Sequence, residues 1–162
     1  MKVFAFVVTY NRLSLLKKTI DCIREQSYPI DKLFIVNNGS TDGTDVWLAQ
    51  QTDLMVINQD NLGGSGGFYR GVRFAYENNA DWIWMMDDDV FPEPYCLERL
   101  LDYRNVSKCI QPARFHSDGV YIQWGYNYIL EKDLEVKVPS ENHSRNYFSV
   151  NVGCFEGMLI HR

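Results

Sequence analysis

Apolar runs alternate with helix-type repeats through residue 90, and this alternation limits the chain to an α/β architecture. The runs are short and rich in β-branched and aromatic side chains, as expected for strands that are buried on both faces. They cover Val3–Val8, Leu33–Val36, Leu54–Ile57 and Trp82–Met86. Strands that alternate with helices pair in parallel through right-handed crossovers. The sequence therefore predicts a mostly parallel, Rossmann-like sheet flanked by helices.

Helices are predicted between these runs. The first has apolar or small side chains at helical spacing, at Leu15, Leu16, Thr19, Ile20 and Ile23. We expect Asn11 or Ser14 to cap it, and Tyr28-Pro29 to close it. A short helix around 46–50 would follow a polar loop in which Ser40, Thr41 or Asp42 can cap it. A longer helix over 68–76 would follow a flexible loop of glycines over 63–67.

The pattern changes beyond residue 90 to short strand-like pieces separated by turn residues. A short helix through Leu97, Leu100 and Leu101 precedes them. Strands are predicted over 110–115, 120–124, 126–130 and 136–138, with a hairpin turn at 116–119, an exposed loop at 142–146 and an apolar segment over 150–160. The second half is therefore predicted to be a β-rich extension.

Length and composition are those of one folded domain. With 162 residues, of which 46% are hydrophobic, the chain can bury a core. We expect a single domain over 1–162, with a ligand-binding half over 1–90 and an incomplete second half over 91–162. A net charge of −5 argues against a nucleic-acid partner, which would require a basic face. A nucleotide stays compatible, because a bound metal can invert the local field.

The cysteines and the first residues bear on the cellular compartment. The four cysteines form no Cys-x-x-Cys pair, so we expect reduced thiols rather than a zinc site or a disulfide framework. The apolar run over 3–8 is too short for a signal sequence, and no segment is long enough to span a bilayer. A cytoplasmic protein is the resulting prediction.

Three aspartates, Asp87, Asp88 and Asp89, directly follow the fourth apolar run. They would emerge at the carboxyl end of a parallel strand, where open α/β sheets bind ligands. Adjacent carboxylates repel one another unless a cation or hydrogen-bond donors offset them. Mg²⁺ and Mn²⁺ are commonly shared between one or two carboxylates and substrate phosphates. The triplet predicts a metal–phosphate site, and a solvated acidic loop is the alternative.

Polar side chains also follow the first two runs. Thr9, Tyr10, Asn11 and Arg12 end the first, and Asn38 follows the second. Tyr10 could stack on a base, Asn38 could pair with the base edge, and Arg12 could meet a phosphate. Each also has a structural explanation: Tyr10 as an aromatic at the edge of the core, Asn11 as a helix cap, and Asn38, with Asn37, as a turn former. Together with the acidic triplet they predict a nucleotide-diphosphate pocket.

A glycine cluster over 61–68 lies between the third and fourth runs. It does not match the dinucleotide fingerprint, because Tyr69 stands where a third glycine is required. No Gly-Lys-Ser/Thr of a P-loop follows either. What remains is an unhindered backbone before a helix, whose N–H groups can approach a ligand. A mobile linker is the alternative.

Four segments occur in a fixed order: Val-Val-Thr-Tyr-Asn-Arg (7–12), Ile-Val-Asn-Asn-Gly-Ser-Thr-Asp-Gly-Thr (35–44), Asn-Leu-Gly-Gly-Ser-Gly-Gly-Phe (61–68) and Met-Asp-Asp-Asp-Val (86–90). Together they resemble the successive signatures of family 2 inverting glycosyltransferases with a GT-A fold. The glycine cluster and triple aspartate resemble the galactofuranosyltransferase-like and rhamnosyltransferase-like branch. Residues 153–162 resemble the strand that follows the acceptor region in this family.

The resemblance implies roles for particular residues. Those implied to bind the nucleotide and donor sugar are Thr9, Tyr10, Asn11, Arg12, Asn38, Asn61, Gly63, Gly64, Gly67, Asp87 and Asp88. Asn38 would contact the pyrimidine ring, and the glycines would pass close to the nucleotide-sugar. Asp87 and Asp89 would be the outer members of an Asp-x-Asp motif that holds Mn²⁺ or Mg²⁺. Asp89 would contact the metal directly, with Asp88 or Asp87 nearer the ribose or donor sugar.

Two departures from the family pattern matter. Asn37 or Asn38 stands where the family often has aspartate, which leaves base selectivity open. The family's general base lies after the strand that 157–162 resembles, so we expect a truncated chain without the complete active site. Glu156 and His161 lie in the right neighbourhood for a substitute, but a structural Glu156 and an inert His161 are the favoured interpretation.

The implied function is transfer of a sugar from a UDP- or dTDP-linked donor to a glycan or lipid-linked acceptor, with inversion and with metal assistance. Cell-surface polysaccharide synthesis at the inner face of the membrane, with peripheral association through regions missing here, is the implied setting. One alternative is a sugar-1-phosphate nucleotidyltransferase, although its glycine- and basic-rich loop is absent after the first strand. The other is a non-catalytic nucleotide-sugar-binding module.

Overall fold

A computed structural model of the chain describes residues 1–115, 119–120, 127–130, 134–137 and 156–162. The chain divides into two compact units, Met1–Pro112 with Phe155–Arg162, and Ala113–Cys154. The first unit thus continues past residue 90, where the sequence suggested a change between halves. It also includes the carboxyl-terminal residues Phe155–Arg162.

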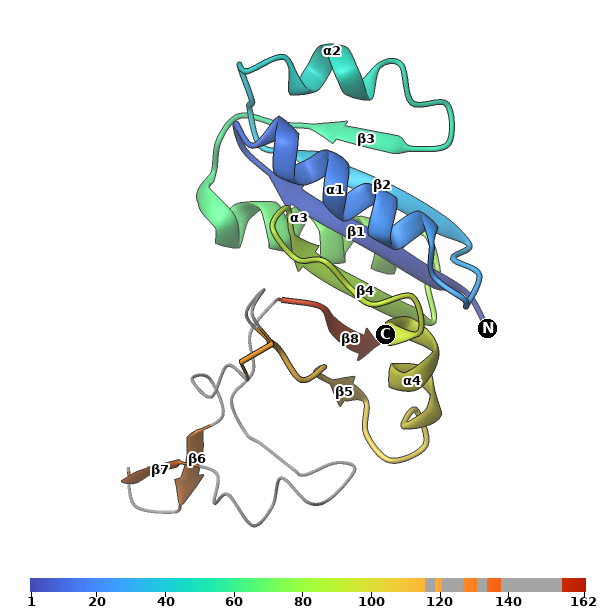
Figure 1. Cartoon of the computed structure of the whole chain (residues 1–162), viewed down its shortest axis with the longest axis vertical. Helices are drawn as coiled ribbons and strands as arrows, with labels where there is room; N and C mark the ends of the chain where they lie inside the picture. Colours follow the sequence, from blue (N-terminus) through green and yellow to red (C-terminus); the bar gives the residue numbers. More distant parts are fainter. Residues whose placement is uncertain (116–118, 121–126, 131–133, 138–155) are drawn as a thin grey trace. The chain divides into compact units, whose positions relative to one another are not determined.

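The first unit is built on a six-stranded mixed sheet in the order β3-β2-β1-β4-β8-β5 (Figure 1). Four neighbouring strands are parallel: β1 (Val3–Thr9), β2 (Lys32–Asn37), β3 (Met55–Asn58) and β4 (Trp82–Asp87). Two further strands are antiparallel to their neighbours: β8 (Met158–His161) on β4, and β5 (Cys109–Ile110) on β8. The predicted α/β class and its parallel strands are confirmed, with small shifts of the strand ends.

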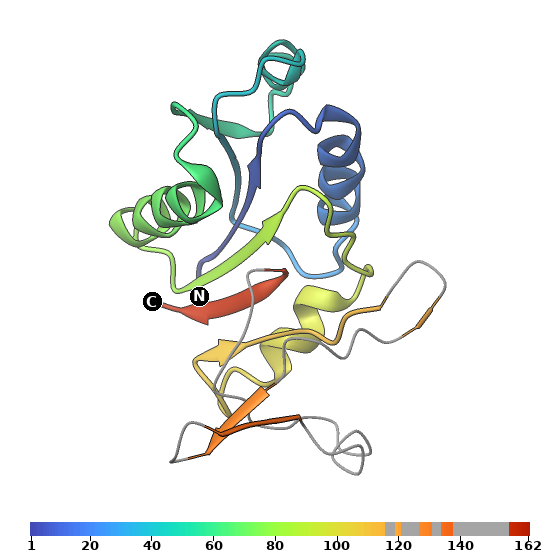
Figure 2. The ribbon, with the colours of Figure 1, turned by 90° about the vertical axis from the view of Figure 1, so that its left-hand side faces the viewer.

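Helices cover both faces of this sheet. They are α1 (Leu13–Arg24), α2 (Thr44–Leu48), α3 (Gly63–Glu77) and α4 (Cys96–Asp102). α1 and α3 lie on opposite faces of the sheet (Figure 2). Successive strand residues point to opposite faces, so β1 sends Ala5 and Val7 into one core cluster and Phe4 and Phe6 into the other. This two-sided burial explains why its apolar run is continuous rather than alternating.

The start of α1 differs from the prediction, because neither Asn11 nor Ser14 caps it. Asn11 has a φ of 54°, in the left-handed region, and its Oδ1 accepts a hydrogen bond from the Thr41 N–H at 2.6 Å. The Leu13 N–H instead donates to Oδ2 of Asp42, at 3.0 Å. A side chain from the β2–α2 loop therefore caps the helix, which local sequence spacing could not reveal.

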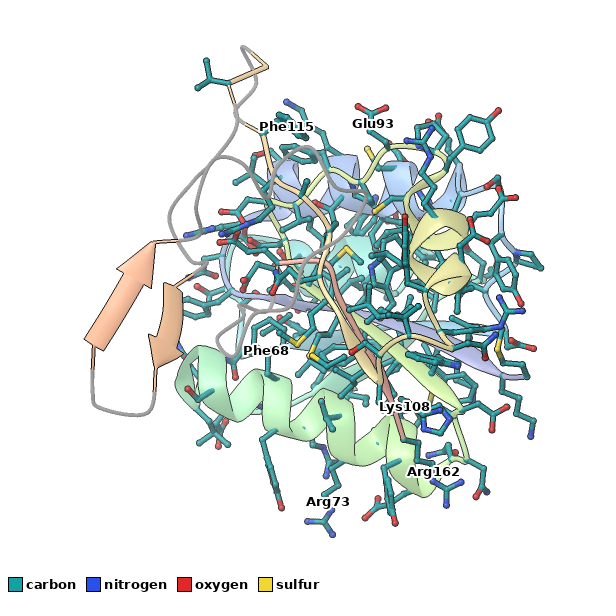
Figure 3. All side chains as sticks on the ribbon, turned by 90° about the horizontal axis from the view of Figure 1, so that it is seen from below. Phe68, Arg73, Glu93, Lys108, Phe115 and Arg162 are labelled. Atoms are coloured by element: carbon teal, nitrogen blue, oxygen red, sulfur yellow. The ribbon has the colours of Figure 1, made fainter. Side chains whose placement is uncertain are left out.

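The predicted glycine loop over 63–67 is also wrong, because α3 begins at Gly63 and includes all five of these residues. A Cβ atom at Gly67 would overlap the Val8 side chain, and one at Gly71 would overlap the Phe6 ring. Each glycine costs a helix about 1 kcal/mol relative to alanine. Close packing of α3 on β1 offsets that cost. Phe68 lies on the sheet-facing side of α3, and Arg73 points outward (Figure 3).

The second unit contains one described antiparallel pair, β6 (Asn127–Leu130) with β7 (Leu134–Lys137). β6 confirms the strand predicted over 126–130 for its described residues 127–130, and β7 begins earlier than the strand predicted over 136–138. β5 is shorter than the predicted strand over 110–115. The predictions for 116–118, 121–124, 142–146 and 150–155 lie outside the described residues.

Two further findings concern the described part of the chain. No helix in it is long and apolar enough to cross a membrane. Cys22, Cys96 and Cys109 are free thiols, whereas Cys154 falls outside the described ranges.

Candidate functional site

The predicted site residues gather at the carboxyl-terminal edge of the parallel strands. The register pairs Thr9 with Asn37 and Val8 with Asp87, so the ends of β1, β2 and β4 lie side by side. Parallel strands finish at one edge of a sheet, which is where this class of fold binds ligands. The sequence prediction that these strand ends meet is thus confirmed.

Asp88 turns inward and is the anchor of this edge. Its Oδ2 accepts a hydrogen bond from the Thr9 hydroxyl at 2.7 Å, and its backbone carbonyl accepts one from the Thr19 hydroxyl at 2.7 Å. Only 3% of the residue is exposed. Burial raises the pKa of Asp88, while the Thr9 hydrogen bond and the Arg12 charge oppose that rise. Asp88 therefore ties β4 to β1 and α1.

Asp89 lies at the surface and pairs with Arg12. Arg12 Nη1 is 2.8 Å from Asp89 Oδ2 and 3.3 Å from Asp88 Oδ1. The side chains of Asp89 and Arg12 are 47% and 52% exposed. The two carboxylates, Asp88 foremost, raise the pKa of the Arg12 guanidinium. The cation expected to meet a phosphate is thus held by the acidic triplet itself.

Asp87 is the unpartnered member of the triplet. It is half-buried, and within the described ranges no hydrogen bond or ion pair reaches its carboxylate. Burial, followed by the charges of Asp89 and Asp88, raises its pKa to about 6. Such a carboxylate is ionised at neutral pH at a cost that a cation would remove.

The triplet does not form a ready-made metal cage. Among the described residues, no three acidic, histidine or cysteine side chains converge on one point. Asp88 faces Thr9, which leaves the uncompensated Asp87 and the half-exposed Asp89 as oxygen donors. Mg²⁺ and Mn²⁺ need no more than one or two carboxylates where phosphates and waters supply the rest. The donor set therefore fits a divalent cation that is shared with a diphosphate.

The raised pKa of Asp87 leads to a stability prediction. A carboxyl whose folded pKa lies above its unfolded pKa destabilises the fold above about pH 6, and this penalty vanishes below the unfolded value near 4. We expect Asp87→Asn to raise the melting temperature at pH 8 in the absence of metal and to have little effect at pH 4. Thermal unfolding of wild type and Asp87→Asn between pH 4 and pH 8 measures this change in melting temperature. An equal change at both pH values would contradict the assigned cause.

The Asn38 side chain organises the loop between β3 and α3. Its Nδ2 donates to Asn61 Oδ1 at 3.1 Å and to the Gly63 carbonyl at 3.0 Å. Its Oδ1 accepts from Gln59 Nε2 at 2.8 Å and from the Leu62 N–H at 3.1 Å. All four hydrogen-bonding positions of the amide are therefore used. The predicted contact with a pyrimidine ring would require one of these bonds to break.

The remaining predicted donor-site residues differ in their availability. Tyr10 is 46% exposed, which leaves its ring open to a ligand. Added Cβ atoms at Gly63 and Gly64 would meet nothing within 4 Å, so this backbone is unhindered, and Gly63 has a φ of +71°. Gly67 is buried against Val8 and serves packing. Asn61 is exposed, but its Oδ1 accepts hydrogen bonds from Asn38 and from the Gly63 N–H at 2.9 Å.

The two candidate substitutes for a general base lie at different edges. The β4–β8 register pairs Trp82 with His161, at the amino-terminal edge of the sheet and away from the aspartates. The His161 ring packs edge-on against Trp82, with 5.0 Å between ring centroids. Met158 pairs with Met85, so the half-buried Glu156 lies on the side where β4 ends.

Sequence reasoning missed the residues that support the site from a distance. Thr19 holds the Asp88 carbonyl, Asp42 caps α1, and Gln59 holds Asn38. A threonine at an apolar helical position was the available signal for the first. The other two depend on loop contacts that only the fold creates.

A hollow of about 390 Å³ opens at the opposite, amino-terminal edge of the sheet. Its lining includes Arg24, Lys32 and Asp53. Arg24 and Asp53 pair with each other at 2.7 Å, so these two charges compensate one another. It lies apart from the strand ends that carry the predicted chemistry.

Comparison with known proteins supports the resemblance at the level of sequence. The family model described as Glycosyl transferase family 2 matches residues 4–160. Galactofuranosyltransferase GlfT1 of Mycobacterium tuberculosis is 36% identical over 91 residues, which cover 54% of this chain and 30% of that protein. Undecaprenyl-phosphate mannosyltransferase of Micrococcus luteus is 28% identical over 129 residues, covering 76% of this chain and 53% of that protein. The matches thus span about a third to a half of these relatives.

Solved structures support the fold. TarS of S. aureus, residues 1–349, superposes with a TM-score of 0.59 at 15% identity, over 99% of this chain and 47% of that one. The same protein in complex with UDP gives a TM-score of 0.57 at 20% identity, over 67% and 34%. The mixed sheet flanked by helices is the GT-A fold. Because the family model also matches nearly the whole sequence, the chain belongs to glycosyl transferase family 2.

Proposed function

We propose that this chain is the donor-binding part of a glycosyltransferase that uses a nucleoside diphosphate sugar, UDP- or dTDP-linked, and Mn²⁺ or Mg²⁺. The main observation behind this proposal is the difference among the three carboxylates at the end of β4. There, Asp88 is anchored inward, whereas Asp87 and Asp89 are left to meet a charged ligand. Family membership and the transferase relatives support the same function.

Each end of the donor would meet a different part of the site. Tyr10 offers an exposed ring on which a base can stack. The open backbone at Gly63 and Gly64 lets a ligand approach the start of α3, where N–H groups favour an anion. Asp87 and Asp89 would hold the cation.

The proposed reaction is attack of an acceptor hydroxyl on the anomeric carbon, from the face opposite the nucleotide, with inversion. A bound cation would supply Lewis-acid neutralisation of the departing diphosphate. This chain's residues would fix the donor so that the diphosphate leaves in one direction. We propose a glycan or lipid-linked acceptor by analogy with the relatives, and we assign the general base to no residue described here.

The test is metal-dependent nucleotide binding. We expect wild-type protein to bind UDP at least about tenfold more tightly with Mn²⁺ than without it, a modest gain for a divalent cation between a carboxylate and a diphosphate. Asp89→Ala should lose this gain, because it removes the exposed carboxylate. Isothermal titration calorimetry of both proteins, with and without Mn²⁺, gives the four affinities.

Asp21→Ala is the matched control, since Asp21 is an exposed carboxylate on α1 whose ion-pair partner among the described residues is Arg24, at 3.7 Å. It should keep the Mn²⁺-dependent gain. If wild type and Asp89→Ala bound UDP with equal affinity in all conditions, the proposal would fail.

The non-catalytic alternative needs a separate measurement, because binding alone does not distinguish it. Release of UDP from a UDP-sugar in the presence of Mn²⁺ would indicate a reactive site. Binding without release or transfer would favour a donor-binding module. Family membership leaves the nucleotidyltransferase alternative without support.

A further inference from the structure

The acidic edge contains a cation of its own. Arg12 stands at the start of α1 and bridges Asp88 and Asp89 through one guanidinium nitrogen, Nη1. In the described part of the chain it is the one basic side chain that pairs with the triplet. The negative charge of this edge is thus partly neutralised by a residue of the chain itself.

The two halves of this bridge are unequal. Asp88 is buried, and its Oδ2 also accepts a hydrogen bond from the Thr9 hydroxyl at 2.7 Å. Asp89 is half-exposed, and among the described residues its carboxylate pairs with Arg12 alone, at 2.8 Å. The Arg12 side chain is itself half-exposed and can swing on its long stem. The contact with Asp89 is therefore the exchangeable one.

A divalent cation that binds Asp89 would meet the guanidinium at short range. Like charges about 4 Å apart repel by several kcal/mol at the effective dielectric of a protein surface. A diphosphate changes this balance, because it brings negative charge that a guanidinium can bind in a bidentate manner. Arg12 thus has a second anion to bind only when the nucleotide is present.

We propose that Arg12 is a resident counterion that makes divalent-cation binding at Asp89 conditional on the diphosphate. Without nucleotide, Arg12 occupies Asp89 and disfavours the cation. With nucleotide, Arg12 transfers to the diphosphate and frees the carboxylate. This inference rests on the proposed function and adds to it the residue that sets the order of binding. Arg12 is a positioning residue here, because it acts through Asp89.

The test measures Mn²⁺ alone and UDP alone, so it does not depend on turnover. Arg12→Met removes the charge, and Arg12→Gln keeps donor groups without it. Both variants should bind free Mn²⁺ at least about tenfold more tightly than wild type, measured by electron paramagnetic resonance, because the repulsion is lost. Both should also bind UDP more weakly without metal. A counterion role predicts that the Mn²⁺ affinity rises while the UDP affinity falls. A damaged site would instead lower the affinity for both ligands.

Arg24→Met is the matched control, because it removes a charge of the same sign from the other end of α1. It should change neither affinity. An Mn²⁺ affinity in Arg12→Met and Arg12→Gln that is unchanged, undetectable or weaker than in wild type would overturn the inference. If wild type still showed Mn²⁺-dependent UDP binding, only the inference would fall. If wild type showed none, the proposed function would fall as well.

Discussion

Gly71→Ala is expected to destabilise the fold by about 3 kcal/mol, the upper end of the range for overpacked cores. Gly71 lies in the middle of α3, and a Cβ atom there would overlap the ring of Phe6 on β1. That ring cannot move aside, because it is fully buried and stacks on Phe34 with 5.1 Å between ring centroids. The helix would have to move away from the sheet, and chemical denaturation of the variant measures the loss.

Gly64→Ala is the control within the same helix. It too replaces a helical glycine, but its added Cβ would meet nothing within 4 Å. Alanine is favoured over glycine in helices by about 1 kcal/mol, so this variant should be unchanged or slightly more stable. If both substitutions destabilised the protein equally, close packing of α3 on β1 would not be the reason for the glycine at position 71.

The parallel strands could be predicted because a strand that is buried on both faces has a continuous apolar sequence. β1 and β4 are buried on both faces, so each contains an unbroken apolar run, and the aspartates that begin at the last residue of β4 mark its end. Strand ends in a parallel sheet share one edge, so the grouping of Thr9 with Asp88 followed from topology alone.

The parts that could not be predicted depend on contacts between segments far apart in the chain. The glycines of α3 look like a loop by propensity, and only their fit against Val8 and Phe6 favours a helix. Asn38 looks like a ligand-binding amide, because nothing local indicates that Gln59 and Leu62 supply its donors. Arg12 looked like a phosphate ligand, and its pairing with Asp89 appears only in the fold. At this site the sequence predicts which side chains share the sheet edge. The fold decides which of them already have hydrogen-bond or ion-pair partners within the chain.

Asn38→Asp is expected to be the most damaging single-atom exchange at this edge. The orientation of the amide is fixed, because the Gly63 carbonyl can only accept and the Leu62 N–H can only donate. A carboxylate would keep the contacts to Gln59 and Leu62, but it would point an oxygen at the Gly63 carbonyl and at Asn61 Oδ1. With only 2% of the residue exposed, we expect a loss of about 3 kcal/mol at pH 8.

The pH dependence of this variant separates charge from shape. The new carboxyl would have a raised pKa in the folded state, so the penalty should be full above that pKa and should shrink as the pH falls toward 4, where the unfolded carboxyl protonates. Asn58→Asp is the matched control, since Asn58 is exposed and its Oδ1 only accepts a hydrogen bond, from Asn37 Nδ2 at 3.0 Å. Asn58→Asp keeps this acceptor oxygen, so the free energy of unfolding should change by no more than about 0.5 kcal/mol. Denaturation curves for both variants at pH 8 and pH 5 measure these differences. A stable, pH-independent Asn38→Asp protein would mean that the amide does not hold the start of α3.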